Sequence, residues 1–167
     1  TSNNAGASCT LAGAGTFTAS GTLTTITNVP IGSYTLSCND LPNMSKTISP
    51  SLTQTLANNG TIAFSVQYTL DTGTIQVNAN DLRAVCSLSG ASSYSASGVT
   101  TTITSAPTGN YTITCNDLPN FTKTFATAAT QALSKNSTIT FTVNYTPNNP
   151  SVLPNLVITK TSNVGQN

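Results

Sequence analysis

The chain has 167 residues, of which only 5% are charged, and its formal net charge is +1. Such a near-neutral chain lacks the basic surface of a nucleic-acid-binding protein and the polybasic patch of a membrane-surface protein. Glutamate and histidine are absent, so general bases are scarce, and we expect no enzyme, no catalytic residues and no cofactor.

Serine, threonine, asparagine and glycine dominate the composition, yet apolar residues alternate regularly with polar ones. A disordered polar chain would lack this alternation, so we expect a folded β-protein with a surface rich in hydroxyl and amide groups. The sequence contains no apolar run of transmembrane length, and we expect no membrane insertion.

The expected elements of the first half are short strands separated by turns. Residues 9–13 (Cys-Thr-Leu-Ala-Gly) and 24–27 (Thr-Thr-Ile-Thr) are the first two strands. A Pro-x-Gly turn at residues 30–32 leads into a third strand, 34–39, in which apolar and polar residues alternate. A last strand carries four inward residues, namely Ile62, Phe64, Val66 and Tyr68.

The second half repeats the first. Residues 7–69 align without a gap with residues 84–146, and about half of the aligned positions are identical. A repeat of this quality predicts two tandem units of the same architecture. Many short strands and turns, without a helical period, predict an all-β chain of two β-sandwiches. We expect domains at residues 1–70 and 71–146, followed by a Pro-rich connector and extension at 147–167.

Each repeat contains one pair of cysteines, Cys9 with Cys38 and Cys86 with Cys115. Without histidine or a Cys-x-x-Cys motif a metal site is improbable, so we expect disulfides and an oxidising, extracellular compartment. Pairing within each repeat is favoured because each repeat is then self-contained. Pairing Cys9 with Cys86 and Cys38 with Cys115 also respects the repeat and stays open.

Both repeats resemble the small sandwiches of the carboxypeptidase-regulatory, PEGA-like group. The resemblance rests on residues 29–36 (Val-Pro-x-Gly-x-Tyr-Thr-Leu) and 106–113 (Ala-Pro-x-Gly-x-Tyr-Thr-Ile), with the preceding Cys-x-Leu-x-Gly strands. It implies a transthyretin-like or immunoglobulin-like fold. It also implies non-catalytic modules of cell-surface, secreted or filament proteins.

Members of that group begin with a Gly-x-Ile-x-Val strand, and the two repeats differ at this point. Repeat two has the strand at residues 73–79, with Ile75 and Val77 on one face. In repeat one the corresponding apolar positions would precede residue 1. The connector 147–150 is followed by an apolar segment that belongs to neither sandwich, Leu156, Val157, Ile158, Thr159 and Lys160.

These two features predict donor-strand assembly. The segment 156–160 of one subunit would fill the vacant position in repeat one of the next, forming a head-to-tail homopolymer, a structural filament. The alternative is that the chain is a repeat segment of a longer surface stalk or adhesin. In that case residues 154–161 would open a further domain, and the missing strand would lie upstream.

Carbohydrate binding is a third possibility, with Phe17, Tyr34, Tyr94 and Tyr111 as candidate platforms. Tyr34 and Tyr111 lie on apolar strand faces, so we expect them in the core. The sequence also contains six Asn-x-Ser/Thr sequons that are candidates for covalent glycans: Asn43, Asn59, Asn110, Asn120, Asn136 and Asn144.

Overall fold

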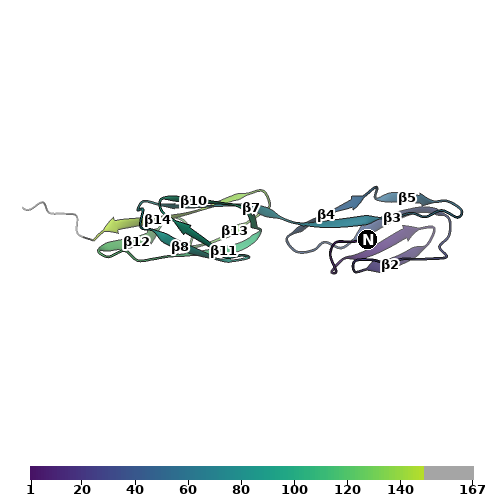
Figure 1. The fold of residues 1–167 in the computed structure, drawn as a ribbon, viewed down its shortest axis with the longest axis horizontal. Coiled ribbons are helices and arrows are strands. Elements are labelled where there is room, and N and C mark those ends of the chain that lie inside the picture. The colour runs from purple at the N-terminus through teal and green to yellow at the C-terminus, as the bar shows by residue number, and fades with distance from the viewer. Residues whose placement is uncertain (149–167) are drawn as a thin grey trace, which may run out of the picture.

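The computed structural model describes residues 1–148, and within this range it contains β-strands and no helix. Two β-sandwich domains lie end to end along the long axis of the molecule (Figure 1). They are called domain 1 (residues 1–70) and domain 2 (residues 72–148), and Asp71 joins them. The expected donor strand at residues 156–160 lies outside the described residues.

Domain 1 has six strands: β1 (Ser8–Gly13), β2 (Thr16–Ser20), β3 (Gly32–Cys38), β4 (Met44–Ser49), β5 (Thr53–Leu56) and β6 (Ser65–Leu70). One sheet has the order β2-β1-β3-β5, and the other consists of β4 and β6 alone. All of these neighbours are antiparallel.

Domain 2 has eight strands: β7 (Thr72–Ala79), β8 (Val85–Gly90), β9 (Tyr94–Ser97), β10 (Thr100–Pro107), β11 (Gly109–Cys115), β12 (Phe121–Phe125), β13 (Thr130–Leu133) and β14 (Thr138–Pro147). Its sheets have the orders β13-β11-β8-β9 and β10-β7-β14-β12. The first corresponds strand for strand to the four-stranded sheet of domain 1. The second contains two strands, β7 and β10, that domain 1 does not have.

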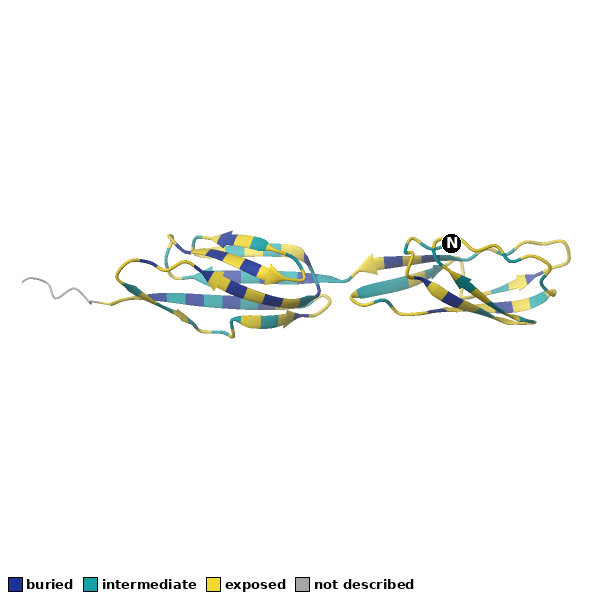
Figure 2. Ribbon diagram, turned by 90° about the horizontal axis from the view of Figure 1, so that it is seen from below, coloured by how far each residue is buried: buried dark blue, intermediate teal, exposed yellow. Residues whose placement is uncertain are grey.

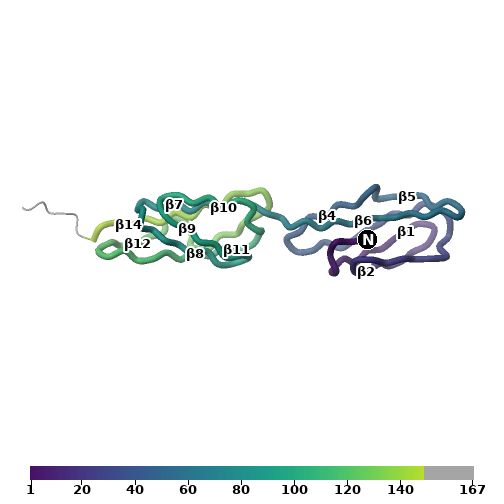
Figure 3. Tube along the Cα trace, viewed as in Figure 1, coloured from purple at the N-terminus to yellow at the C-terminus, as the bar shows by residue number. Residues whose placement is uncertain are grey.

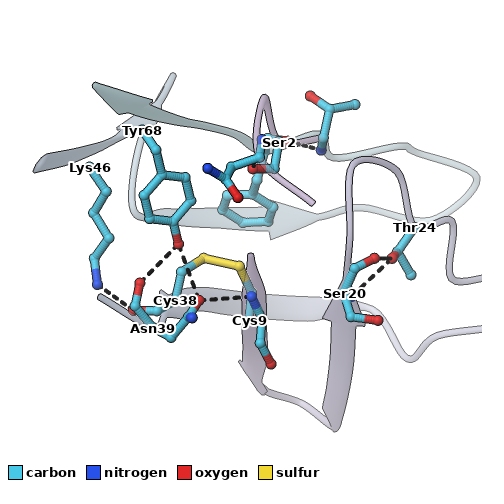
Figure 4. The surroundings of a disulfide bond; sticks show 12 residues. Ser2, Cys9, Ser20, Thr24, Cys38, Asn39, Lys46 and Tyr68 are labelled. Atoms are coloured by element: carbon cyan, nitrogen blue, oxygen red, sulfur yellow. Dashed lines mark hydrogen bonds between the residues drawn. A yellow bond between two sulfur atoms is a disulfide. The ribbon is translucent and has the colours of Figure 1, made fainter. Parts of the chain in front are cut away.

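The disulfides join Cys9 to Cys38 and Cys86 to Cys115, the pairing that the sequence favours. Each links adjacent strands at directly opposed positions, β1 with β3 and β8 with β11. Figure 4 shows the first disulfide beside Tyr68, whose hydroxyl donates to the carbonyl of Asn39 at 2.9 Å. Closing a loop with a separation of 29 residues stabilises a small sandwich by roughly 3–4 kcal/mol in the chain-entropy model.

The missing strand leaves domain 1 with the smaller core. Six buried residues form the cluster in domain 1, whereas sixteen form the cluster in domain 2. Figure 2 shows the regular alternation of buried and exposed residues along the strands of domain 2.

Two expected strands of domain 1 differ from the prediction. Residues 24–27 do not form a strand, although the identical Thr-Thr-Ile-Thr at 101–104 lies within β10. Ile62 and Phe64 precede the start of β6, whereas their counterparts lie within β14. Both segments would pair with the counterpart of β7, and without that partner neither forms a ladder, although the N-terminal ammonium of Thr1 donates to the carbonyl of Phe64 at 2.7 Å. Figure 3 shows the chain of each domain running back and forth along the long axis of the molecule.

Candidate functional site: a strand-shaped groove in domain 1

The strand that domain 1 lacks corresponds to β7 of domain 2, the second strand of its sheet. It pairs antiparallel with β10 and parallel with β14, with Ile75 opposite Ile103 on one side and Ile139 on the other. Ile75 is 0% exposed and Val77 is 4% exposed. A central strand with two buried side chains at alternating positions therefore completes this sandwich.

In domain 1 the same position is an open groove with a volume of about 540 Å³. Residues 20–29 form its first wall and residues 61–66 form its second. Its floor consists of inward side chains of the opposite sheet, among them Leu11, Tyr34 and Leu36. A second hollow of about 480 Å³ continues it along residues 25–31 and 56–62 to the free end of the domain.

Thr1 and Ser2 close the other end of the groove and reveal its register. The N–H of Ser2 donates to the carbonyl of Thr22 at 2.8 Å, as the N–H of Ala79 donates to Val99. Ser2 also forms a parallel bridge with Val66 on β6. These contacts reproduce the last residues of β7, so an occupant would run parallel to β6 and end beside Thr1.

The first wall is held in place without an occupant. At one end the Thr24 hydroxyl donates to the carbonyl of Ser20 at 3.1 Å (Figure 4). At the other end the hydroxyl of Tyr34 donates to the carbonyl of Pro30 at 2.7 Å. The same two contacts hold β10 in domain 2 at 3.1 Å and 2.8 Å. One edge of the groove is therefore positioned in advance for a pairing strand.

The chemistry of the groove is that of an apolar strand site. Among the described residues, no acidic or basic side chain lines the groove. Ile26 and Phe64 are only half-buried on the two walls, whereas Phe141, the counterpart of Phe64, is 0% exposed. Unpaired wall residues offer backbone donors and acceptors, and the floor offers apolar pockets, the combination used in strand addition.

The candidate aromatic residues do not form a sugar platform. Tyr34 and Tyr111 are both 0% exposed, which confirms their expected place in the core. Phe17 and Tyr94 pack against them, each with a ring-centroid distance of 6.1 Å. Burial, followed by the neighbouring Tyr94, raises the pKa of Tyr111 to about 12.

Five of the six sequon asparagines are exposed, and Asn144 is half-buried on β14. Four of the exposed ones occupy equivalent left-handed turn positions with φ of 55–64°: Asn43, Asn59, Asn120 and Asn136. Asn110 lies within β11 instead. The four turn sequons thus share one exposed, left-handed turn position, whereas Asn110 is exposed on a strand.

Lys46 and Lys123 form equivalent ion pairs in the two domains. Each ammonium lies 2.7 Å from a carboxylate, Asp40 in domain 1 and Asp117 in domain 2. Both carboxylates are about nine-tenths exposed, so these pairs contribute little to stability. Within residues 1–148, no cluster of three or more metal-ligating side chains occurs.

The sequence identified the vacancy but not the residues that shape it. The walls and their anchors came from the structure, because residues 20–29 and 61–66 become neighbours only when the sheets fold. The signal that could have located them is the repeat itself. Every residue that contacts β7 in domain 2 has a counterpart 77 positions earlier.

Within the described part of the chain, no helix is long and apolar enough to cross a membrane. No protein-family model and no curated protein matches this chain.

Among solved structures, the chain is similar to the major pilin protein T-13 from Streptococcus pyogenes. The two share 8% identity with a TM-score of 0.43, over 80% of this chain and 73% of the pilin. Another major pilin from Streptococcus pyogenes shares 12% identity with a TM-score of 0.36, over 80% of this chain and 75% of that one. Likeness at this level carries no argument about function.

Proposed function

We propose that this protein is the structural subunit of an extracellular filament that polymerises head to tail by donor-strand complementation. The observation that carries the proposal is the open groove of domain 1, at the position that β7 fills in domain 2. The occupant is the C-terminal segment 156–160 of a neighbouring copy.

The occupant has to imitate β7. Its backbone runs parallel to β6 and antiparallel to the first wall, and alternate side chains enter the pockets that Ile75 and Val77 fill in domain 2. The position between these two, Gln76, is half-buried. A donor therefore needs two branched apolar residues separated by one residue whose side chain may be polar and half-buried.

The tail sequence meets this requirement in one register. Leu156 takes the position of Ile75, and Ile158 takes that of Val77. If Asn148 took the position of Asp71 and the tail kept the spacing of the domain junction, Pro154 would instead take the position of Val77. Proline has no N–H for a central strand, so a proline in a pocket position disfavours that register. With Leu156 at the position of Ile75, Pro154 falls at the position of Gly73 near the start of β7, where a Cβ would meet the side chain of Leu133 and the carbonyl of Ser137, so the start of the donor has to depart from the path of β7.

The donor has to come from another copy because its own groove is out of reach. Asn148 lies ten residues along β14 beyond the domain junction, roughly 33 Å, and the groove position of Ile75 lies beside Ile62, nine residues or roughly 30 Å on the other side. Leu156 is eight residues from Asn148, which spans at most about 28 Å.

The polarity of the chain makes the contact open-ended. In the intact chain β6 leads through Asp71 directly into β7 of the following domain. A tail that follows β14 and enters the groove of the next subunit repeats this relation, with the same strand direction. A heterologous contact that does not close produces a filament.

The extracellular location and the glycans belong to the same proposal. Two disulfides in the described residues are typical of proteins in oxidising compartments. The sequons at exposed turns, Asn43, Asn59, Asn120 and Asn136, are the acceptors that we favour. Peptide mass spectrometry of the native filament tests their occupancy.

The test compares two full-length variants of the tail and one truncation. Leu156→Asp with Ile158→Asp places charges in apolar pockets and is expected to abolish filaments, as is ending the chain after Pro150. The matched control Val157→Gln occupies the half-buried position and keeps assembly. Electron microscopy and sedimentation measure the outcome.

Filaments formed equally well by the truncated chain would overturn the donor-strand mechanism. Loss of assembly in the Val157→Gln variant as well as in the double variant would contradict the proposed register.

A second candidate is a repeat segment of a cell-surface stalk or adhesin. The observation in its favour is the junction at Asp71, where the last strand of one domain leads through a single residue into the first strand of the next. An upstream domain of the same polypeptide would fill the groove in the same way. The intact mass of the mature polypeptide distinguishes this candidate from a filament subunit.

A further inference from the structure

The junction between the two domains is closed around Asp71. Its carboxylate accepts a hydrogen bond from Ser45 of domain 1 at 2.6 Å and lies 2.9 Å from the ammonium of Lys135 of domain 2. Its backbone also bridges the domains, since its N–H donates to Asn43 at 2.8 Å and its carbonyl accepts from Thr108 at 3.0 Å. We call the part of domain 1 around Asn43, Ser45 and Asp71 the donating end of the junction. The part of domain 2 around Thr108, Lys135 and Asn136 is the receiving face.

The free end of domain 2 reproduces the donating end. Asn148 occupies the position of Asp71, and its N–H donates to Asn120 at 2.8 Å, as that of Asp71 donates to Asn43. Its side-chain oxygen accepts a hydrogen bond from Thr122, the counterpart of Ser45. The far end of the molecule therefore presents the same arrangement that domain 1 presents to domain 2.

The free end of domain 1 reproduces the receiving face. Asn59 has φ of 57°, and its counterpart Asn136, in the turn of domain 2 that contacts Thr72, has φ of 55°. The turn is closed in both by one hydrogen bond, from Gly60 to Ala57 at 3.0 Å in domain 1 and from Ser137 to Ser134 at 3.1 Å in domain 2. The receiving turn of domain 1 is therefore already formed without a partner.

Exposure shows that this face of domain 1 is uncovered. Thr108 is 6% exposed beside Asp71, whereas its counterpart Ile31 is 64% exposed. In domain 2 the N–H groups of Thr108 and Asn136 donate to the carbonyls of Asp71 and Thr72. Within residues 1–148, the corresponding N–H groups of Ile31 and Asn59 have no backbone acceptor.

From these correspondences we infer that the face formed by Ile31, Asn58 and Asn59 seats the Asn148 end of a second copy. This end-to-end contact rests on the proposed filament and adds a second interface to the inserted strand. The tail is long enough for both, because eight residues separate Asn148 from Leu156 while four separate Asp71 from Ile75.

The two kinds of junction differ in charge. The internal junction pairs Asp71 with Lys135, and at the subunit junction the corresponding residues are the neutral Asn148 and Asn58. Exposed charge pairs weaken with ionic strength, whereas contacts between amides and apolar groups do not. Assembly of the natural chain is therefore expected to depend little on salt.

The experiment transplants the internal ion pair to the subunit junction. In the full chain, Asn148→Asp with Asn58→Lys is expected to lower the critical concentration for assembly about two- to fivefold at low salt. The gain should disappear near 1 M salt, where the Debye length is about 3 Å. Asn148→Lys with Asn58→Lys places like charges together and should raise the critical concentration.

The control introduces the same charges away from the junction. Ser87→Asp with Ser95→Lys lies on directly opposed, exposed positions of β8 and β9 and should leave the critical concentration unchanged. If the transplanted pair behaves like this control at every salt concentration, the end-to-end contact is wrong. If the unmodified chain forms no filaments, the proposed function itself fails.

A second pair of variants tests the apolar part of the face. Ile31→Arg and Leu52→Arg replace residues of domain 1 that are 64% and 52% exposed, so neither should unfold the domain. Only Ile31→Arg is expected to raise the critical concentration. Equal effects of the two substitutions would also overturn the end-to-end contact.

Discussion

Tyr34 and Tyr111 occupy equivalent positions in the two domains, one beside an open groove and one beside β7. Both side chains are fully buried, and both hydroxyls donate to a proline carbonyl four residues earlier in the chain. The contact forms with or without an inserted strand. Residue-level contacts of this kind preserve the shape of the groove in the unassembled chain.

Asp71 is the residue whose titration reports on the domain junction. The hydrogen bond from Ser45, followed by the contacts of Lys135, lowers the pKa of this carboxyl from its ordinary value of 3.8. A lowered pKa means that its stabilising contacts are complete above pH 3.8 and are lost as the pH falls through the folded-state value. NMR titration of the side-chain carboxyl carbon measures this directly.

Substitutions at its two partners separate the causes. Ser45→Ala and Lys135→Met should each raise the pKa of Asp71, because the hydrogen bond from Ser45 and the contacts of Lys135 both lower it. A midpoint at or above 3.8 in the unsubstituted chain contradicts the junction geometry.

At the scale of elements, identical sequences adopt different structures in the two domains. Thr-Thr-Ile-Thr forms part of β10 at residues 101–104 but no strand at 24–27. The local propensity is the same, so the difference comes from the partner strand, which only domain 2 has. Pairing by a neighbour decides whether such a segment becomes a strand.

Hydrogen exchange can follow this difference residue by residue. Amides of residues 23–29 and 61–64 are expected to exchange rapidly in the unassembled chain, because no strand pairs with these walls. The corresponding residues 100–106 and 138–141 should be protected in both states and serve as the internal control. In filaments both walls should become protected.

Walls that remain equally unprotected in filaments would show that the groove stays empty. Protection already present in the unassembled chain would show that the groove is filled before assembly.

At the scale of the whole molecule, the decisive feature is the direct passage from one sandwich into the next. β6, the last strand of domain 1, leads through Asp71 into β7, the first strand of domain 2. Domain 1 offers an equivalent groove, and the proposed filament continues the relation between copies. Stability and assembly are then linked, because the contact that joins the subunits also completes a core.

A self-complemented chain tests this link. Residues 154–158 placed directly before Thr1 would put Ile158 at the position of Val77, with Leu156 two residues earlier. With the tail after Pro150 removed, this chain should be monomeric. Burial of two branched side chains should stabilise domain 1 by roughly 3–6 kcal/mol.

Denaturant unfolding measures the stabilisation, and sedimentation measures the loss of assembly. The control carries serine in place of both branched residues of the added segment and should gain nothing. An added strand that leaves the stability of domain 1 unchanged would contradict the proposed occupant.

The sequence by itself determined the all-β class, the repeat and the apolar faces of the strands that occur in both domains. These features follow from alternation and from the 77-residue offset, which are local or periodic signals. The same offset exposed the vacancy in domain 1, since a missing strand is visible as a missing counterpart.

Only the tertiary structure decided that residues 24–27 stay outside the sheet and that two distant segments form the walls of one groove. It also decided how Asp71, Ser45 and Lys135 meet at the junction. These outcomes depend on contacts between residues far apart in the sequence, which no local pattern encodes. A strand exists where a neighbour accepts its hydrogen bonds, and that neighbour is known only once the chain has folded.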